Sequence, residues 1–199
     1  LYKLRTCSYD LNEKKIEEVD DEIKELGGTA TLVPMDLTDS PAIDRLGAGL
    51  YERYGKLDIL IGNAGVLGKL SPLGHIDPKS WDEVIAVNLT ANWRLLRSMD
   101  PLLRLSDAGR VVMMTSSVGA KARAYWGAYA ISKAALENMT MTYAEEILKT
   151  NIKANLINPG ATRTRMRAEA YPGEKPETVK APEVVAKAVL ELCTSACDK

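Results

Sequence analysis

Three side chains that could act together in a proton transfer lie close to one another in the sequence. Ser116 is thirteen positions before Tyr129, and Lys133 is four positions after it. Residues four apart share one face of a helix, so a helix here places the Tyr129 phenol beside the Lys133 ammonium. A phenol has an unperturbed pKa of about 10, and a fixed cation nearby lowers that pKa. A serine hydroxyl facing the same point could hold a substrate oxygen while the phenol gives or takes a proton. The pattern indicates a carbonyl or alcohol site that needs a hydride carrier beside it.

Short β-rich runs alternate with longer helical runs along the chain, and this alternation predicts the fold. The periodicity predicts helices over 13–26, from Ser40-Pro41 onward, and over 78–105, 129–149 and 181–195, with strands over 30–37, 57–65, 110–116 and 151–158. Such alternation is typical of a three-layer α/β sandwich with a parallel sheet, here one domain over residues 1–199. The segment 162–180 has little apolar periodicity and contains two prolines, so we expect an irregular loop of the kind that covers a site.

Small or polar residues follow four of the apolar runs. These are Asp36, Asn63-Ala64-Gly65, Ser116 and Asn158-Pro159-Gly160. Ligands of parallel α/β sheets gather at the carboxyl ends of the strands, so these residues predict one continuous binding rim.

Together these residues resemble the short-chain dehydrogenase/reductase family, Rossmann-fold enzymes that move a hydride between a nicotinamide dinucleotide and an alcohol or carbonyl. The family's tyrosine-x-x-x-lysine signature matches Tyr129 and Lys133, and its serine matches Ser116 rather than Ser117. Its helix asparagine matches Asn88. The resemblance implies that Tyr129 is the general acid or base and that Ser116 holds the substrate oxygen. It also implies that Lys133 binds the nicotinamide ribose and lowers the tyrosine pKa, and that Asn88 interrupts its helix to hold a water in a proton relay.

The resemblance also implies a cofactor-binding set. Its members are Arg5, Asp36, Leu37, Asn63, Ala64, Gly65, Tyr129, Lys133, Pro159, Gly160, Thr162 and Thr164. In the family, the aspartate at the Asp36 position touches the adenine and the threonine at the Thr164 position contacts the carboxamide. Arg5-Thr6, at the end of the first apparent strand, resembles the arginine that pairs with the 2′-phosphate of NADP, while Asp10 is the nearest acidic candidate for NAD. NADP is therefore the expected cofactor, with NAD as the alternative.

The chain departs from the family at its two ends. It shows no glycine-rich TGxxxGxG turn, the element that lets a pyrophosphate approach a helix N-terminus. It starts at LYKLRT, which is similar to the second strand of the fold, and stops at CTSACDK, before the last strand of most relatives. We expect the first strand–helix unit and the last strand to be absent, leaving a slot of roughly 9–10 Å in the sheet. A longer polypeptide, a rearranged sheet or a partner chain could each account for that slot.

Composition narrows the class of partner. A formal net charge of −1 with both signs spread along the chain predicts no nucleic-acid or membrane surface. The absence of a long apolar run and of a signal-peptide pattern predicts the cytosol. One histidine and three cysteines predict no structural metal site. The helices expected at 79–104 and 129–148 resemble those through which relatives dimerise, which predicts a homo-oligomer, a dimer or a tetramer.

The favoured interpretation is an NAD(P)-dependent oxidoreductase acting on a small alcohol or carbonyl. Two alternatives stay open: a catalytically silent relative or interaction module without dinucleotide binding, and a lyase or epimerase using the same tyrosine and lysine. Arg163, Arg165 and Arg167 are compatible with an anionic substrate, but a solvated loop is the favoured interpretation of that run. The Asp36 carboxylate could equally serve only the chemistry of a turn.

Overall fold

The computed structural model describes residues 5–8 and 13–194 of the 199-residue chain. Its strands are β1 (Arg5–Ser8), β2 (Thr29–Leu32), β3 (Ile59–Gly62), β4 (Arg110–Met114) and β5 (Lys153–Ile157). Its α-helices are α1 (Glu13–Glu25), α2 (Ser40–Tyr54), α3 (Pro78–Ile85), α4 (Ala91–Leu103), α5 (Ser117–Ala120), α6 (Gly127–Glu146), α7 (Arg165–Ala170) and α8 (Pro182–Cys193).

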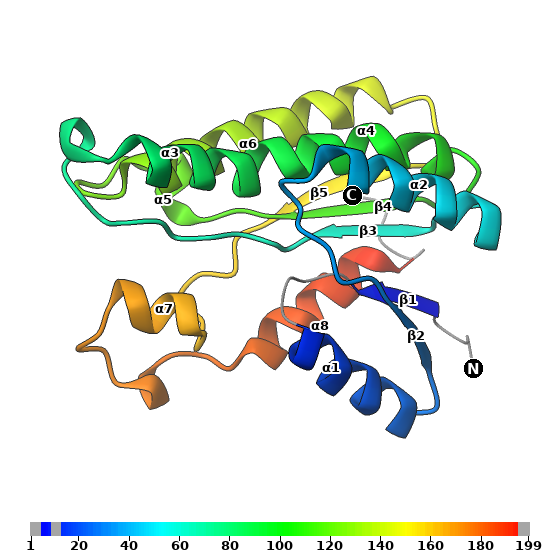
Figure 1. Ribbon diagram of the computed structural model, residues 1–199, viewed down its shortest axis with the longest axis horizontal. Helices are drawn as coiled ribbons and strands as arrows, with labels where there is room; N and C mark the ends of the chain where they lie inside the picture. Colours follow the sequence, from blue (N-terminus) through cyan, green and yellow to red (C-terminus); the bar gives the residue numbers. More distant parts are fainter. Residues whose placement is uncertain (1–4, 9–12, 195–199) are drawn as a thin grey trace.

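The described strands form two parallel sheets (Figure 1). One contains β1 and β2, and the other has the order β3-β4-β5. Within the described residues no ladder joins β1 to β3, which is where the sequence predicts an interruption of the sheet. Each strand is followed by a helix, as expected for a Rossmann-like α/β fold.

The main core lies between the three-stranded sheet and the layer of α2, α4 and α6 (Figure 1). In strand β4 the first four residues are buried, and an apolar run follows Arg110 from Val111 to Met114, which is typical of a parallel strand covered on both faces. Helix α8 contacts β4, and Arg110 of β4 donates from Nε to the Thr194 carbonyl at the end of α8 (3.3 Å). The three-layer arrangement predicted from the sequence is therefore confirmed. The largest fully buried side chains include Ile43, Leu95, Met99, Leu103, Met113, Leu136 and Ile147.

The long helix expected over 78–105 is interrupted. Helix α3 ends at Ile85, a π-helical turn spans Ala86–Thr90, and α4 begins at Ala91. A π-turn inside a helix is uncommon and often marks a functional site. Asn88 lies within this turn, so the expected interruption of the helix at that asparagine is present.

The segment 162–180 is more ordered than the sequence predicts. It contains the six-residue helix α7 and a 3₁₀ turn, Pro176–Thr178. The Thr164 hydroxyl caps α7 by accepting a hydrogen bond from the Arg167 backbone N–H (3.2 Å), and Arg165 pairs with Glu169 one turn later (2.9 Å). Caps and i,i+4 pairs of this kind sustain a short helix without an apolar stripe, which is why periodicity missed it.

Two further boundaries differ from the prediction. Strand β2 ends at Leu32, because Pro34 has no N–H to donate and ends the pairing well before residue 37. Helix α2 is capped by Asp39 rather than by Ser40, through an acceptor bond from the Ala42 N–H (3.2 Å). None of the helices in the described part of the chain is long and apolar enough to span a membrane.

Candidate active site

Tyr129 and Ser116 meet above the carboxyl end of β4. Ser116 follows this strand with an extended backbone, and its hydroxyl makes no capping bond to α5. The Tyr129 side chain, on the first turn of α6, is buried, and its phenol is hydrogen-bonded to Ser116. Ser117, by contrast, is an exposed residue at the start of α5. The structure therefore brings together the pair that the thirteen-residue spacing selects.

Lys133 lies one turn after Tyr129 and is almost fully buried. Its Nζ donates to the Met114 carbonyl at the end of β4 (2.7 Å) and stands 5.8 Å from the centre of the Tyr129 ring. Burial lowers the pKa of Lys133 to about 8. A buried ammonium held between strand and helix is poised to change charge near neutral pH.

The expected lowering of the tyrosine pKa is wrong for the chain as described. Burial raises the pKa of Tyr129 above 10, and its hydrogen bond with Ser116 opposes that rise without overcoming it. Desolvation of the phenolate prevails because the Lys133 ammonium is directed at a carbonyl group rather than at the phenol oxygen. The phenol is consequently protonated at neutral pH, which suits a proton donor.

Asn88 is fully buried and uses its whole amide group. Its Oδ1 accepts from the Val66 N–H (2.8 Å), and its Nδ2 donates to the Val66 carbonyl (2.9 Å) and to the Ser132 hydroxyl (3.0 Å). Ser132 in turn donates to the Tyr129 carbonyl (2.8 Å). The π-turn is thus tied both to the loop after β3 and to the first turn of α6.

Two glycines allow the backbone to approach Lys133 closely. A Cβ on Gly65 would stand 3.6 Å from the Lys133 Nζ and 3.3 Å from the Asn88 Oδ1. A Cβ on Gly119 of α5 would stand 3.0 Å from the backbone of Lys133 and Ala134. A side chain at Gly65 would contact both Lys133 and Asn88, so glycine at this position lets the turn after β3 pack closely against them.

The residues predicted at the ends of β3 and β2 differ from one another in exposure and in contacts. After β3, Asn63 is exposed and Ala64 is half-buried. After β2, Asp36 is exposed, and its Oδ1 accepts from the Thr38 N–H and hydroxyl (both 2.8 Å), which lowers the pKa of that carboxyl. Leu37 packs against the main core. The turn chemistry of Asp36 is therefore present, and its carboxylate is accessible as well.

The turn after β5 is built from local hydrogen bonds. Asn158 accepts from the Gly160 N–H (3.0 Å), Gly160 has a left-handed φ of 60°, and Thr162 donates to the Pro159 carbonyl (3.0 Å). The Thr162 side chain is buried, and the hydroxyl of exposed Thr164 is engaged as the cap of α7. This turn directs the chain from the sheet toward α7.

The arginine expected to read a 2′-phosphate is not at a carboxyl strand end. Strand β1 runs to Ser8, so Arg5 lies three positions before its last residue. The sequence places Arg5-Thr6 at the end of this strand, whereas the strand in the structure continues to Ser8 and pairs Arg5 with Thr29 of β2. Asp10, the acidic candidate, lies outside the described residues.

Sequence reasoning missed two polar contributors to the site, Ser132 and Thr115. Ser132 bridges Asn88 and Tyr129, and a hydroxyl three positions after a catalytic candidate on the same helix could have indicated it. The buried Thr115 donates from its hydroxyl to the Glu137 carboxylate, which fastens the residue before Ser116 to α6. Trp126 packs edge-on against the Tyr129 ring (5.9 Å between centroids).

The sequence that builds this site is similar to the sequences of known proteins. A family profile described as short chain dehydrogenase matches residues 2–175. The chain belongs to this family. It is 39% identical over 174 residues to an uncharacterized oxidoreductase, YciK, of Escherichia coli strain K12, covering 86% of this chain and 69% of that protein. It is 40% identical over 133 residues to an uncharacterized NAD-dependent oxidoreductase of Mycobacterium tuberculosis, covering 66% of this chain and 48% of that one.

Solved structures of short chain dehydrogenases agree with the fold. A putative short chain dehydrogenase from Escherichia coli CFT073, in complex with NADPH, superposes with a TM-score of 0.91 at 37% identity over 96% of this chain and 80% of that one. One from Pseudomonas syringae superposes with a TM-score of 0.92 at 36% identity over 96% and 78%. These short-chain dehydrogenases therefore share both the fold and more than a third of the aligned sequence with this chain.

Proposed function

We propose that this short-chain dehydrogenase transfers a hydride between a nicotinamide dinucleotide and a small carbonyl or alcohol substrate. The observation that carries the proposal is the convergence of Ser116, Tyr129 and Lys133 at the carboxyl end of β4. Membership of a family of NAD(P)-dependent oxidoreductases supports it.

In the reductive direction, Ser116 positions the carbonyl oxygen and Tyr129 donates its proton to that oxygen. A phenol with a raised pKa is fully protonated at pH 7, so the acid form needs no further activation. The Lys133 ammonium stabilises the phenolate left behind, and Asn88 and Ser132 hold the first turn of α6 in place. The role of Asn88 in holding a relay water stays a prediction. In the oxidative direction Tyr129 is the base.

The residues present fit a dinucleotide on the side of Gly65 and Lys133. Glycine at position 65 keeps a side chain away from the Lys133 Nζ, and Lys133 would offer an ammonium donor to ribose hydroxyls. Asp36, Asn63 and the Pro159–Thr164 turn would hold the remainder, with Asp36 and Asn63 exposed for contact. When bound, the nicotinamide supplies or accepts the hydride. NADP is the favoured form because structural neighbours hold NADP or NADPH.

Titration of the purified chain with NADPH and NADH tests this proposal. We expect saturable quenching of protein fluorescence, with tighter binding of NADPH than of NADH. Absence of binding at millimolar concentrations of either cofactor would instead support the catalytically silent alternative. Binding without redox turnover, together with elimination or epimerisation of alcohol substrates, would support the lyase or epimerase alternative.

A pH profile reports on Lys133. We expect kcat/KM for carbonyl reduction to fall as pH rises through about 8, because the ammonium loses its proton there while Tyr129 stays protonated. The free energy of unfolding changes in the opposite direction. An unfolded Lys133 keeps a pKa of 10.5, so the unfolded chain binds more protons than the folded chain between pH 8 and 10.5. The contribution of this lysine to the free energy of unfolding therefore rises with pH over that interval. Initial rates and urea denaturation from pH 6 to 10 measure both. A flat rate profile across pH 8 contradicts the assignment.

The proposal includes a homo-oligomer formed through α4 and α6. A hollow of about 500 Å³ between these helices is lined by apolar and aromatic residues that include Trp93, Leu96, Met139 and Tyr143, and by the charged residues Arg97, Asp100, Arg104 and Glu146. Trp93 is 46% exposed and Met141 52% exposed on the same helices. Large exposed apolar side chains on two adjacent helices are typical of a subunit interface. Sedimentation velocity of the chain would contradict the proposal if it gave only monomer.

A further inference from the structure

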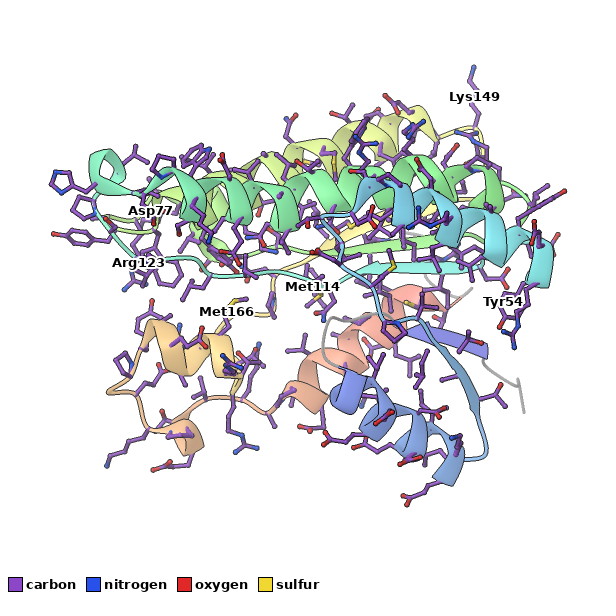
Figure 2. All side chains as sticks on the ribbon, viewed as in Figure 1. Tyr54, Asp77, Met114, Arg123, Lys149 and Met166 are labelled. Carbon is purple, nitrogen blue, oxygen red and sulfur yellow. The ribbon has the colours of Figure 1, made fainter. Side chains whose placement is uncertain are left out.

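An aromatic cluster joins the loop before α6 to α7 directly beside Tyr129. The rings of Trp126 and Tyr129 lie 5.9 Å apart, and those of Trp126 and Tyr171 lie 5.8 Å apart. Met166 and Ala170 of α7 pack against the small buried group that contains Tyr129 and Leu67. Figure 2 labels Arg123 and Met166 on the two segments that the cluster connects. The candidate proton donor is thus walled on one side by flat, partly apolar side chains.

Arg123 lies over this wall. Its guanidinium carbon stands 5.6 Å from the centre of the Trp126 ring and 5.4 Å from that of Tyr171, and its Nη1 donates to the Tyr171 hydroxyl. These contacts fix the direction of the guanidinium while using one of its five N–H donors on a neutral partner. The group therefore keeps both its charge and donors for another ligand.

The charge of Arg123 is not neutralised by a neighbouring acid. Arg167 lies on the same Tyr171 ring (3.7 Å) but donates two bonds of 2.6 Å to the Glu174 carboxylate, and Arg165 pairs with Glu169. Among the residues that the structure describes, no carboxylate forms an ion pair with Arg123. Two of the three arginines of the 163–167 run are therefore paired with acids. Arg123 and Arg163 have no ion pair among the described residues, and of these two it is Arg123 that lies against the Trp126 and Tyr171 rings.

The surroundings of Arg123 are positive as a whole. The segments 121–126 and 162–180 contain seven basic and three acidic residues, whereas the entire chain has a formal net charge of −1. The backbone also adopts an uncommon conformation here, since Tyr125 has a φ of 72°, and its carbonyl accepts from the Ser71 N–H (3.0 Å). A left-handed tyrosine costs of order 1 kcal/mol or more and is maintained only where the surroundings enforce it.

From this geometry we propose that Arg123 binds an anionic group of the substrate and that Trp126, between Arg123 and Tyr129, contacts the substrate's apolar body. The substrate class is a carbonyl compound, or the corresponding alcohol, that bears a carboxylate away from the reacting carbon. This inference rests on the proposed function, because it places the reacting oxygen at Tyr129. The hydride reaches the carbonyl carbon from the reduced nicotinamide, the proton reaches the oxygen from Tyr129, and the products are the alcohol and the oxidised cofactor.

A matched pair of substrates tests the proposal. 3-Acetylbenzoate and 3-acetylbenzamide have nearly the same shape and differ in charge at a group remote from the ketone. We expect wild type with NADPH to show the higher kcat/KM on the acid, and Arg123→Gln to lower kcat/KM on the acid about tenfold or more through KM, with little change on the amide. Arg123→Lys should retain part of the preference. Arg165→Gln, which removes a charge already paired with Glu169, should leave the preference unchanged.

Fluorescence measures ligand binding separately from turnover. Trp126 fluorescence, identified by its loss in Trp126→Phe, should respond to the acid at lower concentration than to the amide, and Arg123→Gln should remove this difference. The proposal is overturned if wild type prefers neither compound in rate and in fluorescence, or if Arg123→Gln affects both equally. Failure of the proposed function has a different signature, because NADPH then fails to bind to every variant, Arg165→Gln included.

Discussion

Tyr129→Phe is expected to lower kcat for carbonyl reduction by about 10²–10⁴-fold, the usual contribution of a positioned general acid. The phenol oxygen is the only atom removed, and its described partner is the Ser116 hydroxyl. The ring keeps its packing against Trp126 and the buried Leu67 group, so the fold and NADPH affinity should be unchanged. Steady-state rates with a small ketone, together with an NADPH titration, measure the two effects.

The matched control is on the same helix. Tyr143 of α6 is also buried, and its hydroxyl donates to the Asp100 Oδ1 (2.8 Å), far along the helix from Ser116. Tyr143→Phe removes one hydrogen bond and is expected to cost about 1 kcal/mol of stability with turnover preserved. If Tyr129→Phe retained wild-type turnover, or if both variants lost it equally, Tyr129 would not be the proton donor.

Much of the site was predictable because its chemistry depends on short sequence distances. A spacing of four on a helix fixes the neighbourhood of Tyr129 and Lys133 whatever the rest of the fold does. The buried run of β4 fixes Ser116 at a carboxyl strand end, where a parallel sheet gathers its ligands. Once α6 packs against β4, these two local features place the phenol and the hydroxyl at the same end of the sheet.

Other properties depend on packing that periodicity does not encode. The raised pKa of Tyr129 comes from desolvation, and its direction differs from the one predicted from a nearby lysine. Helix α7 is stabilised by the Thr164 cap and by ion pairs rather than by an apolar stripe. The role of Arg123 becomes visible only when the structure places it over rings from two separate segments. In each case the decisive contact joins residues that sequence spacing alone leaves unrelated.

The interruption between the two sheets was predictable for a different reason. The order of matched motifs predicts that the first apparent strand and the strand at 57–65 do not pair directly, and the described residues contain no ladder between β1 and β3. On β3, Ile61 is 40% exposed although it lies within a mostly apolar strand. An apolar side chain left accessible on a strand of this kind is compatible with further covering by protein.

Asn88→Ala is expected to lower the free energy of unfolding by about 2–4 kcal/mol and to abolish most turnover. The substitution leaves the Val66 N–H and carbonyl without their described partners in a partly buried location and removes the buried donor to Ser132. The loop that carries Gly65 and the turn that carries Tyr129 then lose their common anchor. Urea denaturation measures the first effect, and initial rates at a temperature where the variant is folded measure the second.

Asn92→Ala separates hydrogen bonding from the loss of buried volume. Asn92 is also buried in this helical region, but its amide makes one described bond, from Nδ2 to the Asn88 carbonyl (2.9 Å), and its Oδ1 has no hydrogen-bond partner among the described residues. Both substitutions remove the same atoms, so the difference between them reports on the two additional hydrogen bonds of the Asn88 amide. Because an unpaired buried oxygen is itself costly, Asn92→Ala should be the milder change. Equal losses of stability and turnover in the two variants would mean that Asn88 merely fills space.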